Sequence, residues 1–229
     1  ITTSGFGDVL YIRDEHRYDM FDPQIEYPDP LIPREQTWSV EERVSAKGEI
    51  VTLIDEAALV ELASQISDKG LRSVAVCLLN SYANNVNEQC VKKVLERELP
   101  GVHITLSSDI APQIREYPRT STTCINAYST PFSLPYLTGL TDQVRAEGCD
   151  LEPLIMLSNG GVVGAKTAAL QPVRMIESGP AAGALAAGLL SKTYGISDLI
   201  SFDMGGTTAK ACLIQDGEPL ITGEFEVDR

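Results

Sequence analysis

Residues 199–214 read LISFDMGGTTAKACLI, and this stretch decides how the rest of the sequence is interpreted. An apolar run ends at Asp203, two glycines follow at Gly205 and Gly206, and a second β-prone run begins at Lys210. This order predicts two strands joined by a tight glycine-rich turn. Adjacent glycines permit positive φ angles and leave room for a ligand to approach the backbone.

The predicted turn carries the groups that a phosphate and metal site needs. Backbone N–H groups at Gly205 and Gly206, with the hydroxyls of Thr207 and Thr208, provide hydrogen-bond donors to an anion. Asp203 provides a carboxylate that can hold Mg²⁺ through water, because hard cations prefer oxygen ligands. The competing interpretation is an ordinary hairpin whose acidic residue caps the turn. Spacing alone leaves both interpretations open.

Composition favours a globular chain and disfavours two classes of partner. The 229 residues are 43% hydrophobic, which is enough for one large domain or two small ones. With 32 acidic and 18 basic residues, the net charge of -14 opposes binding to nucleic acid or to anionic membranes. No apolar run is long enough to span a bilayer and no signal peptide is visible. Because the chain begins with isoleucine, we expect a fragment of a longer protein.

Cysteine and histidine usage points to a cytoplasmic protein without a zinc site. The cysteines are odd in number and scattered, and no pair has the CxxC spacing, so we expect free thiols in a reducing compartment. The two histidines, His16 and His103, are far apart, which argues against a His-rich zinc site or a Ser-His-Asp triad. The five cysteines are Cys77, Cys90, Cys124, Cys149 and Cys212.

The segment from Asp55 to residue 106 has the pattern of a parallel βαβ unit. Apolar residues recur at helical spacing over residues 58–66 and 90–99. A continuous apolar run at residues 74–79 follows the first helix, and a second predicted strand at residues 102–106 follows the other. Ser81 and Ser107 come just after the two predicted strands, where open α/β sheets place ligands. Serine is also an ordinary loop residue, so function at this edge is one of two interpretations.

Arg119 stands beside a run of three hydroxyl residues. Pro118 favours a helix that begins near Ser121, breaks near Pro131 and Pro135, and resumes over residues 136–147. In that arrangement Arg119 either binds an oxyanion at a helix N-terminus or is an exposed arginine beside an N-cap.

Two further glycine loops precede the hairpin. A predicted strand at residues 154–157 ends in SNGG, and a predicted strand at residues 173–176 ends in ESGPAAG, which opens into a small-residue helix at residues 184–190. A Gly-Pro turn that feeds a helix exposes unpaired N–H groups at the positive end of the helix dipole. Packing explains the small helix residues, but not why both strands end in glycine loops. The candidate phosphate-facing residues here are Gly160, Gly161, Gly179, Ala181 and Gly183.

At this point five separated motifs share one resemblance. In chain order, TTSGFGDVLYIR, EYPRTSTTCINAYSTP, LSNGGV, ESGPAAG and SFDMGGTTAKACLI resemble segments of the hydantoinase A / 5-oxoprolinase / acetone carboxylase family. The resemblance implies an α/β chain that forms part of an actin-like ATPase (ribonuclease H-like) fold, with a parallel or mixed sheet, helices on its faces and the start of a C-terminal β-hairpin. It assigns residues 1–100 to the N-terminal region and residues 101–229 to the first part of the hydantoinase A core.

The resemblance also implies an activity. Family members use ATP to phosphorylate a carbonyl oxygen, so we expect a fragment of an ATP-dependent amidohydrolase that opens a cyclic amide or imide of the hydantoin, N-methylhydantoin or 5-oxoproline type. The alternatives are a ketone carboxylase subunit of the same family and a non-catalytic nucleotide-binding module. ATP and Mg²⁺ are the implied cofactors, and a B-type subunit is a possible partner. The fragment alone is expected to be inactive.

The hairpin motif matches the family pattern at five positions: Asp203, Gly205, Gly206, Thr207 and Thr208. It departs from the pattern at Lys210, where many relatives carry an acidic residue. A metal or base role at that position is therefore not expected. By resemblance Asp203 is the catalytic and metal-binding candidate, and Glu177 and Arg119 are candidates for substrate contacts.

Overall fold

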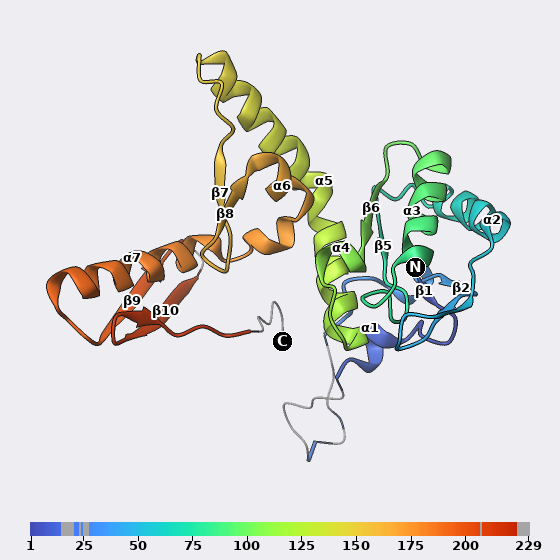
Figure 1. The fold of residues 1–229 in the computed structure, drawn as a ribbon, viewed down its shortest axis with the longest axis horizontal. Coiled ribbons are helices and arrows are strands. Elements are labelled where there is room, and N and C mark those ends of the chain that lie inside the picture. The colour runs from blue at the N-terminus through green and yellow to red at the C-terminus, as the bar shows by residue number, and fades with distance from the viewer. Residues whose placement is uncertain (15–20, 23, 25–27, 207, 224–229) are drawn as a thin grey trace. The chain divides into compact units, whose positions relative to one another are not determined.

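The computed structural model describes residues 1–14, 21–22, 24, 28–206 and 208–223. The chain divides into two compact units, Ile1–Phe132 and Ser133–Arg229, and the boundary falls inside the long helix α5 (Glu116–Ala146) (Figure 1). Strands form several sheets of two or three strands, interleaved with helices. The predicted α/β class is thus confirmed. None of the helices in the described ranges has both the length and the apolar character required to cross a bilayer.

The first unit is built on short parallel strands. β5 pairs in parallel with β6, β1 pairs in parallel with β2, and a bridge between Thr2 and Cys77 connects the two pairs. β3 and β4 form a separate antiparallel pair. The strand bounds are β1 (Thr2–Thr3), β2 (Ser39–Val40), β3 (Arg43–Val44), β4 (Ile50–Thr52), β5 (Ser73–Val76) and β6 (His103–Leu106).

Two helices enclose the core of this unit, as their periodicity predicts. In α2 (Glu56–Ser67) the side chain of Asp55 accepts a hydrogen bond from the N–H of Ala57 at 3.0 Å, which caps the helix start. α3 (Val86–Glu98) packs against α2 and β6. The predicted βαβ order is confirmed, because β5, α3 and β6 follow one another and the two strands are parallel. The buried apolar side chains of α2 and α3 are Leu59, Leu62, Ala63, Ile66, Val91, Val94 and Leu95.

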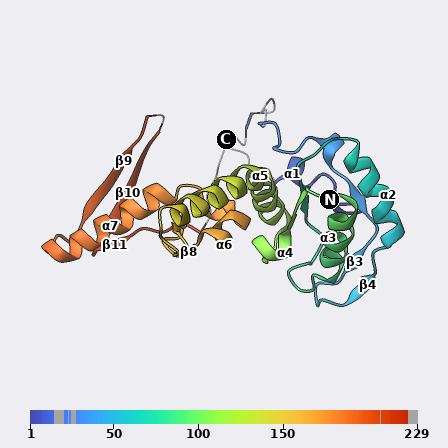
Figure 2. The same cartoon turned by 90° about the horizontal axis from the view of Figure 1, so that it is seen from above.

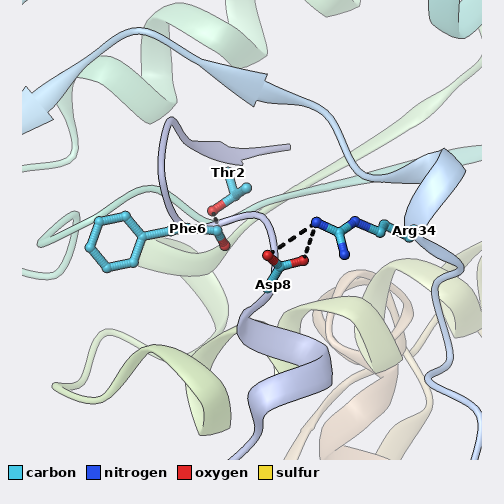
Figure 3. A network of polar contacts seen from close by, with 4 residues as sticks. All are labelled: Thr2, Phe6, Asp8 and Arg34. Atoms are coloured by element: carbon cyan, nitrogen blue, oxygen red, sulfur yellow. Dashed lines mark hydrogen bonds and ion pairs between the residues drawn. The ribbon is translucent and has the colours of Figure 1, made fainter.

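Residues 9–12, whose apolar run favours a strand, instead form the one-turn helix α1 (Val9–Ile12). The carbonyl of Asp8 accepts hydrogen bonds from the N–H groups of Tyr11 and Ile12, both at 2.9 Å. The Asp8 carboxylate faces the Arg34 guanidinium at 2.8 Å, and Thr2 donates to the Phe6 carbonyl across the preceding turn (Figure 3). The hydrogen bonds to the Asp8 carbonyl close a helical turn, so residues 9–12 do not adopt the extended conformation of a strand. Arg34 belongs to a 3₁₀ turn (Arg34–Gln36).

The predicted helix break at the prolines is wrong, because α5 runs without interruption through Pro118, Pro131 and Pro135. Pro118 lies in the first turn, where its missing N–H has no partner in the helix. Pro135 cannot donate to the carbonyl of Pro131, but the Arg72 guanidinium donates to that carbonyl at 3.1 Å. A contact distant in sequence therefore replaces the lost helix bond.

The second unit contains the end of α5, two antiparallel strand pairs, a second long helix and two short helical segments. β7 (Leu154–Met156) and β8 (Val162–Gly164) are antiparallel, as are β9 (Leu199–Met204) and β10 (Ala209–Gln215). The helix α7 (Ser178–Tyr194) packs against β9 and β10 (Figure 2). The remaining elements of the chain are α4 (Ser107–Ile110), α6 (Ala165–Leu170), a 3₁₀ turn (Pro172–Met175) and β11 (Glu218–Pro219).

Two boundaries in this unit differ from expectation. The predicted strand at residues 173–176 is mostly the 3₁₀ turn, because Pro172 starts a helical turn and Arg174 N–H bonds back to the Gln171 carbonyl at 3.0 Å. The predicted loop at residues 177–183 is the start of α7, which begins at Ser178. The glycines of ESGPAAG thus lie inside a helix.

Candidate functional site

The β9–β10 hairpin has the strand–turn–strand form that its sequence predicts. Six residue pairs hold the two strands in register, and Asp203 stands opposite Lys210. The N–H of Gly205 donates to the carbonyl of Thr208 at 2.9 Å, so a backbone bond closes the turn. Asp203 and Thr208 are exposed, whereas Thr207 lies outside the described residues. The exposed acid and turn are accessible to a ligand from solvent.

Neither backbone angles nor packing explain the two glycines of this turn. Gly205 and Gly206 are absent from the residues with positive φ angles. A Cβ on Gly206 would meet nothing within 4 Å, and one on Gly205 would make only an ordinary contact with the Thr208 carbonyl. The absence of side chains therefore leaves the backbone of the turn open to close approach, which is what a phosphate requires.

The start of α7 is connected to this hairpin by an ion pair. The Nζ of Lys210 lies 3.0 Å from the Oε1 of Glu177, the residue that precedes the first turn of α7. Glu177 has a left-handed backbone (φ +63°), and its side chain makes no capping hydrogen bond. The structure thus joins two of the three predicted phosphate-facing elements through their charged residues.

The glycines of α7 fall into two groups. A Cβ on Gly179 or Gly183 would meet nothing within 4 Å, and both residues are exposed near the positive end of the helix dipole. A Cβ on Gly188 would lie 3.0 Å from the carbonyl of Gly217, which is tighter than an ordinary contact, so close packing favours glycine there. Ala181 is half-buried in the same first turns as Gly179. Packing within this chain therefore explains Gly188 but not Gly179 or Gly183.

The third predicted element is the turn between β7 and β8. Gly160 has φ +81°, and a Cβ there would lie 2.5 Å from the side chain of Leu185 in α7. The N–H of Gly161 donates to the Asn159 side chain at 3.0 Å, and the Ser158 hydroxyl donates to the Arg174 carbonyl at 2.7 Å. Turn geometry and packing account for both glycines, so the structure adds no reason to assign them to a ligand.

Mg²⁺ fits this hairpin only as an ion shared with phosphate. The described part of the chain contains no group of three His, Cys, Asp or Glu side chains able to hold a metal. Asp203 is a single exposed carboxylate, and its cross-strand neighbour is a cation. Mg²⁺ commonly retains several waters and takes one or two carboxylates together with phosphate oxygens. Asp203 suits that arrangement and does not suit a metal held by protein groups alone.

Arg119 is buried in the first unit, with 1% of its surface exposed. Both sequence interpretations of Arg119 are wrong in one respect, since the side chain is neither exposed nor at a helix that begins at Ser121. Its Nη1 donates to the hydroxyls of Ser81 and Ser107, the latter at 3.1 Å, and its Nε has no hydrogen-bond partner among the described residues. The guanidinium also lies 5.8 Å from the ring centre of Tyr82. The serines predicted to face a ligand face Arg119 instead.

Glu88 completes this internal network and was not predicted. It is fully buried in α3, where it accepts hydrogen bonds from the Ser107 hydroxyl at 2.6 Å and from the N–H groups of Leu78 and Ser108 at 3.0 and 2.9 Å. Helical spacing was the available signal, because Glu88 lies three residues before Val91 on the buried face. Glu88 and Arg119 are linked through Ser107, so each charge is compensated inside the unit.

Burial also raises the pKa values of two thiols near this network. Burial raises the pKa of the Cys77 thiol above its usual value, although the nearby Arg119 opposes the shift. Burial raises the pKa of Cys124 to about 12. The five cysteines are free, as their spacing predicts. Cys77 and Cys124 are therefore protonated at neutral pH and are poor nucleophiles.

Comparison with known proteins gives these observations a context. A family model described as "Hydantoinase/oxoprolinase N-terminal region" matches residues 1–99, and the "Hydantoinase/oxoprolinase" model matches residues 119–229. The chain belongs to the hydantoinase/oxoprolinase family. The resemblance that the five motifs predict is thereby confirmed.

Individual relatives cover nearly all of the chain. Protein MJ0964 of Methanocaldococcus jannaschii is 40% identical over 99% of the chain and 33% of its own length. The caprolactamase subunit alpha of Pseudomonas jessenii is 31% identical over 95% of the chain and 32% of its own length. The nucleotide-free structure of an ATP-dependent acetone carboxylase superimposes with a TM-score of 0.84 at 26% identity, covering 95% of this chain and 32% of that one. The chain thus spans about a third of the length of these relatives.

Proposed function

We propose that this chain is part of an ATP-dependent amidohydrolase that opens a cyclic amide or imide. The observation that carries the proposal is the open Gly205–Gly206 turn beside Asp203, on a hairpin tied by Lys210 to the start of α7. In this proposal the hairpin is the phosphate-binding hairpin of an actin-like ATPase fold. The caprolactamase relative, an amide hydrolase by its name, supports an amide as the substrate class.

The contributions of this chain are electrostatic. The N–H of Gly206 and the hydroxyl of Thr208 donate hydrogen bonds to the terminal phosphates of ATP, whereas the N–H of Gly205 is engaged in closing the turn. Asp203 would hold Mg²⁺, and the ion would supply neutralisation of phosphate charge. The first-turn N–H of Gly179 in α7 faces the same phosphates, whereas the N–H of Ala181, a candidate on sequence grounds, donates to the Glu177 carbonyl. Positioning and charge neutralisation of this kind supply most of the catalysis in phosphoryl transfer, so no nucleophilic side chain is required. Thr207, Gly160 and Gly161 remain candidates on sequence grounds alone.

A ketone carboxylase is the second candidate function. The structural similarity to acetone carboxylase, whose title states ATP-dependent carboxylation, favours it. The two activities share the ATP-binding elements and differ in whether bicarbonate is required. Because the caprolactamase relative is named as a subunit, we also propose that a second subunit completes the enzyme. A nucleotide-binding module without catalysis is the remaining alternative.

The test is phosphate release from ATP by the complete polypeptide with its partner subunit. The compounds are hydantoin, 5-oxoproline, caprolactam and acetone, each with and without bicarbonate. We expect a cyclic amide to stimulate release, and we expect Asp203→Asn to abolish the stimulation. Asp198→Asn is the matched control, because Asp198 is an exposed acid just before the same strand.

Each outcome assigns one function. Stimulation by acetone only in the presence of bicarbonate would move the assignment to a carboxylase. Nucleotide binding without stimulation by any compound would favour the non-catalytic module. Equal activity of Asp203→Asn and Asp198→Asn would contradict the role of Asp203.

A further inference from the structure

We propose that Lys210 binds a phosphate of the nucleotide and that Glu177 holds Lys210 until the nucleotide displaces it. The inference rests on the proposed function, because it presupposes ATP at the hairpin. It adds an exchange of partners: the Lys210 ammonium leaves the Glu177 carboxylate and pairs with phosphate.

The position of Lys210 is the first reason. It lies directly opposite Asp203 and two residues after Thr208, so its side chain starts at the base of the open turn. Its Nζ is 3.0 Å from Glu177 Oε1, at the start of α7. A lysine ammonium is a compact charge on a flexible stem, which suits it to contact phosphate from a neighbouring strand.

The conformation of Glu177 is the second reason. A residue with a Cβ rarely adopts φ near +63°, and such strain persists only where the surrounding structure enforces it. Aspartate, asparagine, serine or threonine would be the usual residue at this helix start, and the Glu177 side chain makes no capping bond. The carboxylate instead meets the cation of the hairpin. This residue therefore contributes a charge contact rather than a helix cap.

The exposure of the pair is the third reason. The side chains of Lys210 and Glu177 are 36% and 32% exposed, so neither is locked in the interior. Ion pairs of this exposure contribute little to stability, because water screens them. A phosphate group carries more charge than one carboxylate and bonds strongly to ammonium groups. Exchange from Glu177 to phosphate is therefore favourable once ATP occupies the turn.

The test compares two substitutions that should change the affinity for ATP in opposite directions. In the complete polypeptide with its partner subunit, the Kd for ATP is measured by calorimetry with and without Mg²⁺. We expect Lys210→Met to weaken binding about tenfold, because one phosphate contact is lost. We expect Glu177→Gln to tighten binding about threefold, because the competing carboxylate is removed. In the Lys210→Met background, Glu177→Gln should lose this effect.

The pair Lys192–Glu218 provides the control. It connects the far end of α7 to β11 and is at least as exposed as Lys210–Glu177. Lys192→Met and Glu218→Gln should leave the Kd for ATP unchanged. If both Lys210→Met and Glu177→Gln weaken binding, the pair only braces the hairpin and the inference is wrong. If the unsubstituted protein binds no ATP, the proposed function itself fails.

Discussion

The two units contain similar charged and hydroxyl groups in opposite surroundings. In the first, Arg119, Ser107 and Glu88 are almost completely buried and bonded to one another. In the second, Asp203 is exposed on a hairpin strand and Lys210 is only partly covered. A buried charge must be compensated within the protein, whereas an exposed charge remains available to a ligand. The difference teaches that residue type suggests a site, and burial decides whether that site faces inward.

Removal of the Arg119 side chain is expected to have the largest effect on stability. Arg119→Met should lower the free energy of unfolding of the first unit by about 3 kcal/mol, because it leaves buried hydroxyls and Glu88 without the compensating charge. Fluorescence of Trp38, the single tryptophan, reports on this unit because Trp38 packs on its core. Urea titration gives the measurement. Arg97→Met is the matched control, since Arg97 is exposed in the same unit and pairs with its neighbour Glu98, and it should leave the urea midpoint almost unchanged. Equal losses of unfolding free energy in the two variants would show that burial does not decide how much an arginine contributes to stability.

Within the second unit, Gly188 tests close packing. Gly188→Ala places a Cβ about 3 Å from the Gly217 carbonyl, so the backbone of one of the two residues must shift by a few tenths of an ångström. We expect a loss of about 1–3 kcal/mol, as for other overpacked contacts. Hydrogen exchange of the α7 amides measures this loss of stability. Unchanged exchange protection would show that the contact between α7 and the turn that joins β10 to β11 is looser than the structure indicates.

The buried thiol of Cys124 predicts a stability that depends on alkaline pH. Its pKa is raised to about 12 by burial, so the unfolded chain releases this proton at lower pH than the folded chain does. The stabilisation is complete below about pH 8.5, the ordinary thiol pKa, and is lost as the pH rises toward 12. We expect a loss of about 2 kcal/mol between pH 8 and pH 10. Cys124→Ala should reduce this slope in urea titrations; an unchanged slope would contradict the assignment.

Gly183→Ala should have the smallest effect on stability and an opposite sign. A Cβ at this exposed helix position meets nothing within 4 Å, so alanine should stabilise α7 by about 0.5–1 kcal/mol. Hydrogen exchange of α7 again provides the measurement. If Gly183 faces the nucleotide as proposed, the same substitution weakens ATP binding. A variant that is more stable and binds ATP normally would remove Gly183 from the site.

Much of the local structure could be predicted from the sequence. Helix α2 begins after Asp55 as its cap and periodicity indicate, and the β9–β10 hairpin forms where the glycine turn predicts. One error arose where a distant contact overrides local preference, and another where local hydrogen bonds favour a helical turn over a strand. Pro135 does not break α5, because Arg72 satisfies the freed carbonyl of Pro131. The apolar run at residues 9–12 forms a helical turn because Asp8 accepts the N–H bonds.

The sequence by itself determined the family, the α/β class and the hairpin that carries Asp203. These depend on motifs and on contacts between residues close together along the chain, which composition and spacing encode directly. Only the tertiary structure decided that Arg119 is buried against Ser81 and Ser107, and that Glu177 meets Lys210. Burial and pairing depend on segments tens of residues apart, and a short pattern contains no information about the partner that long-range packing brings to it.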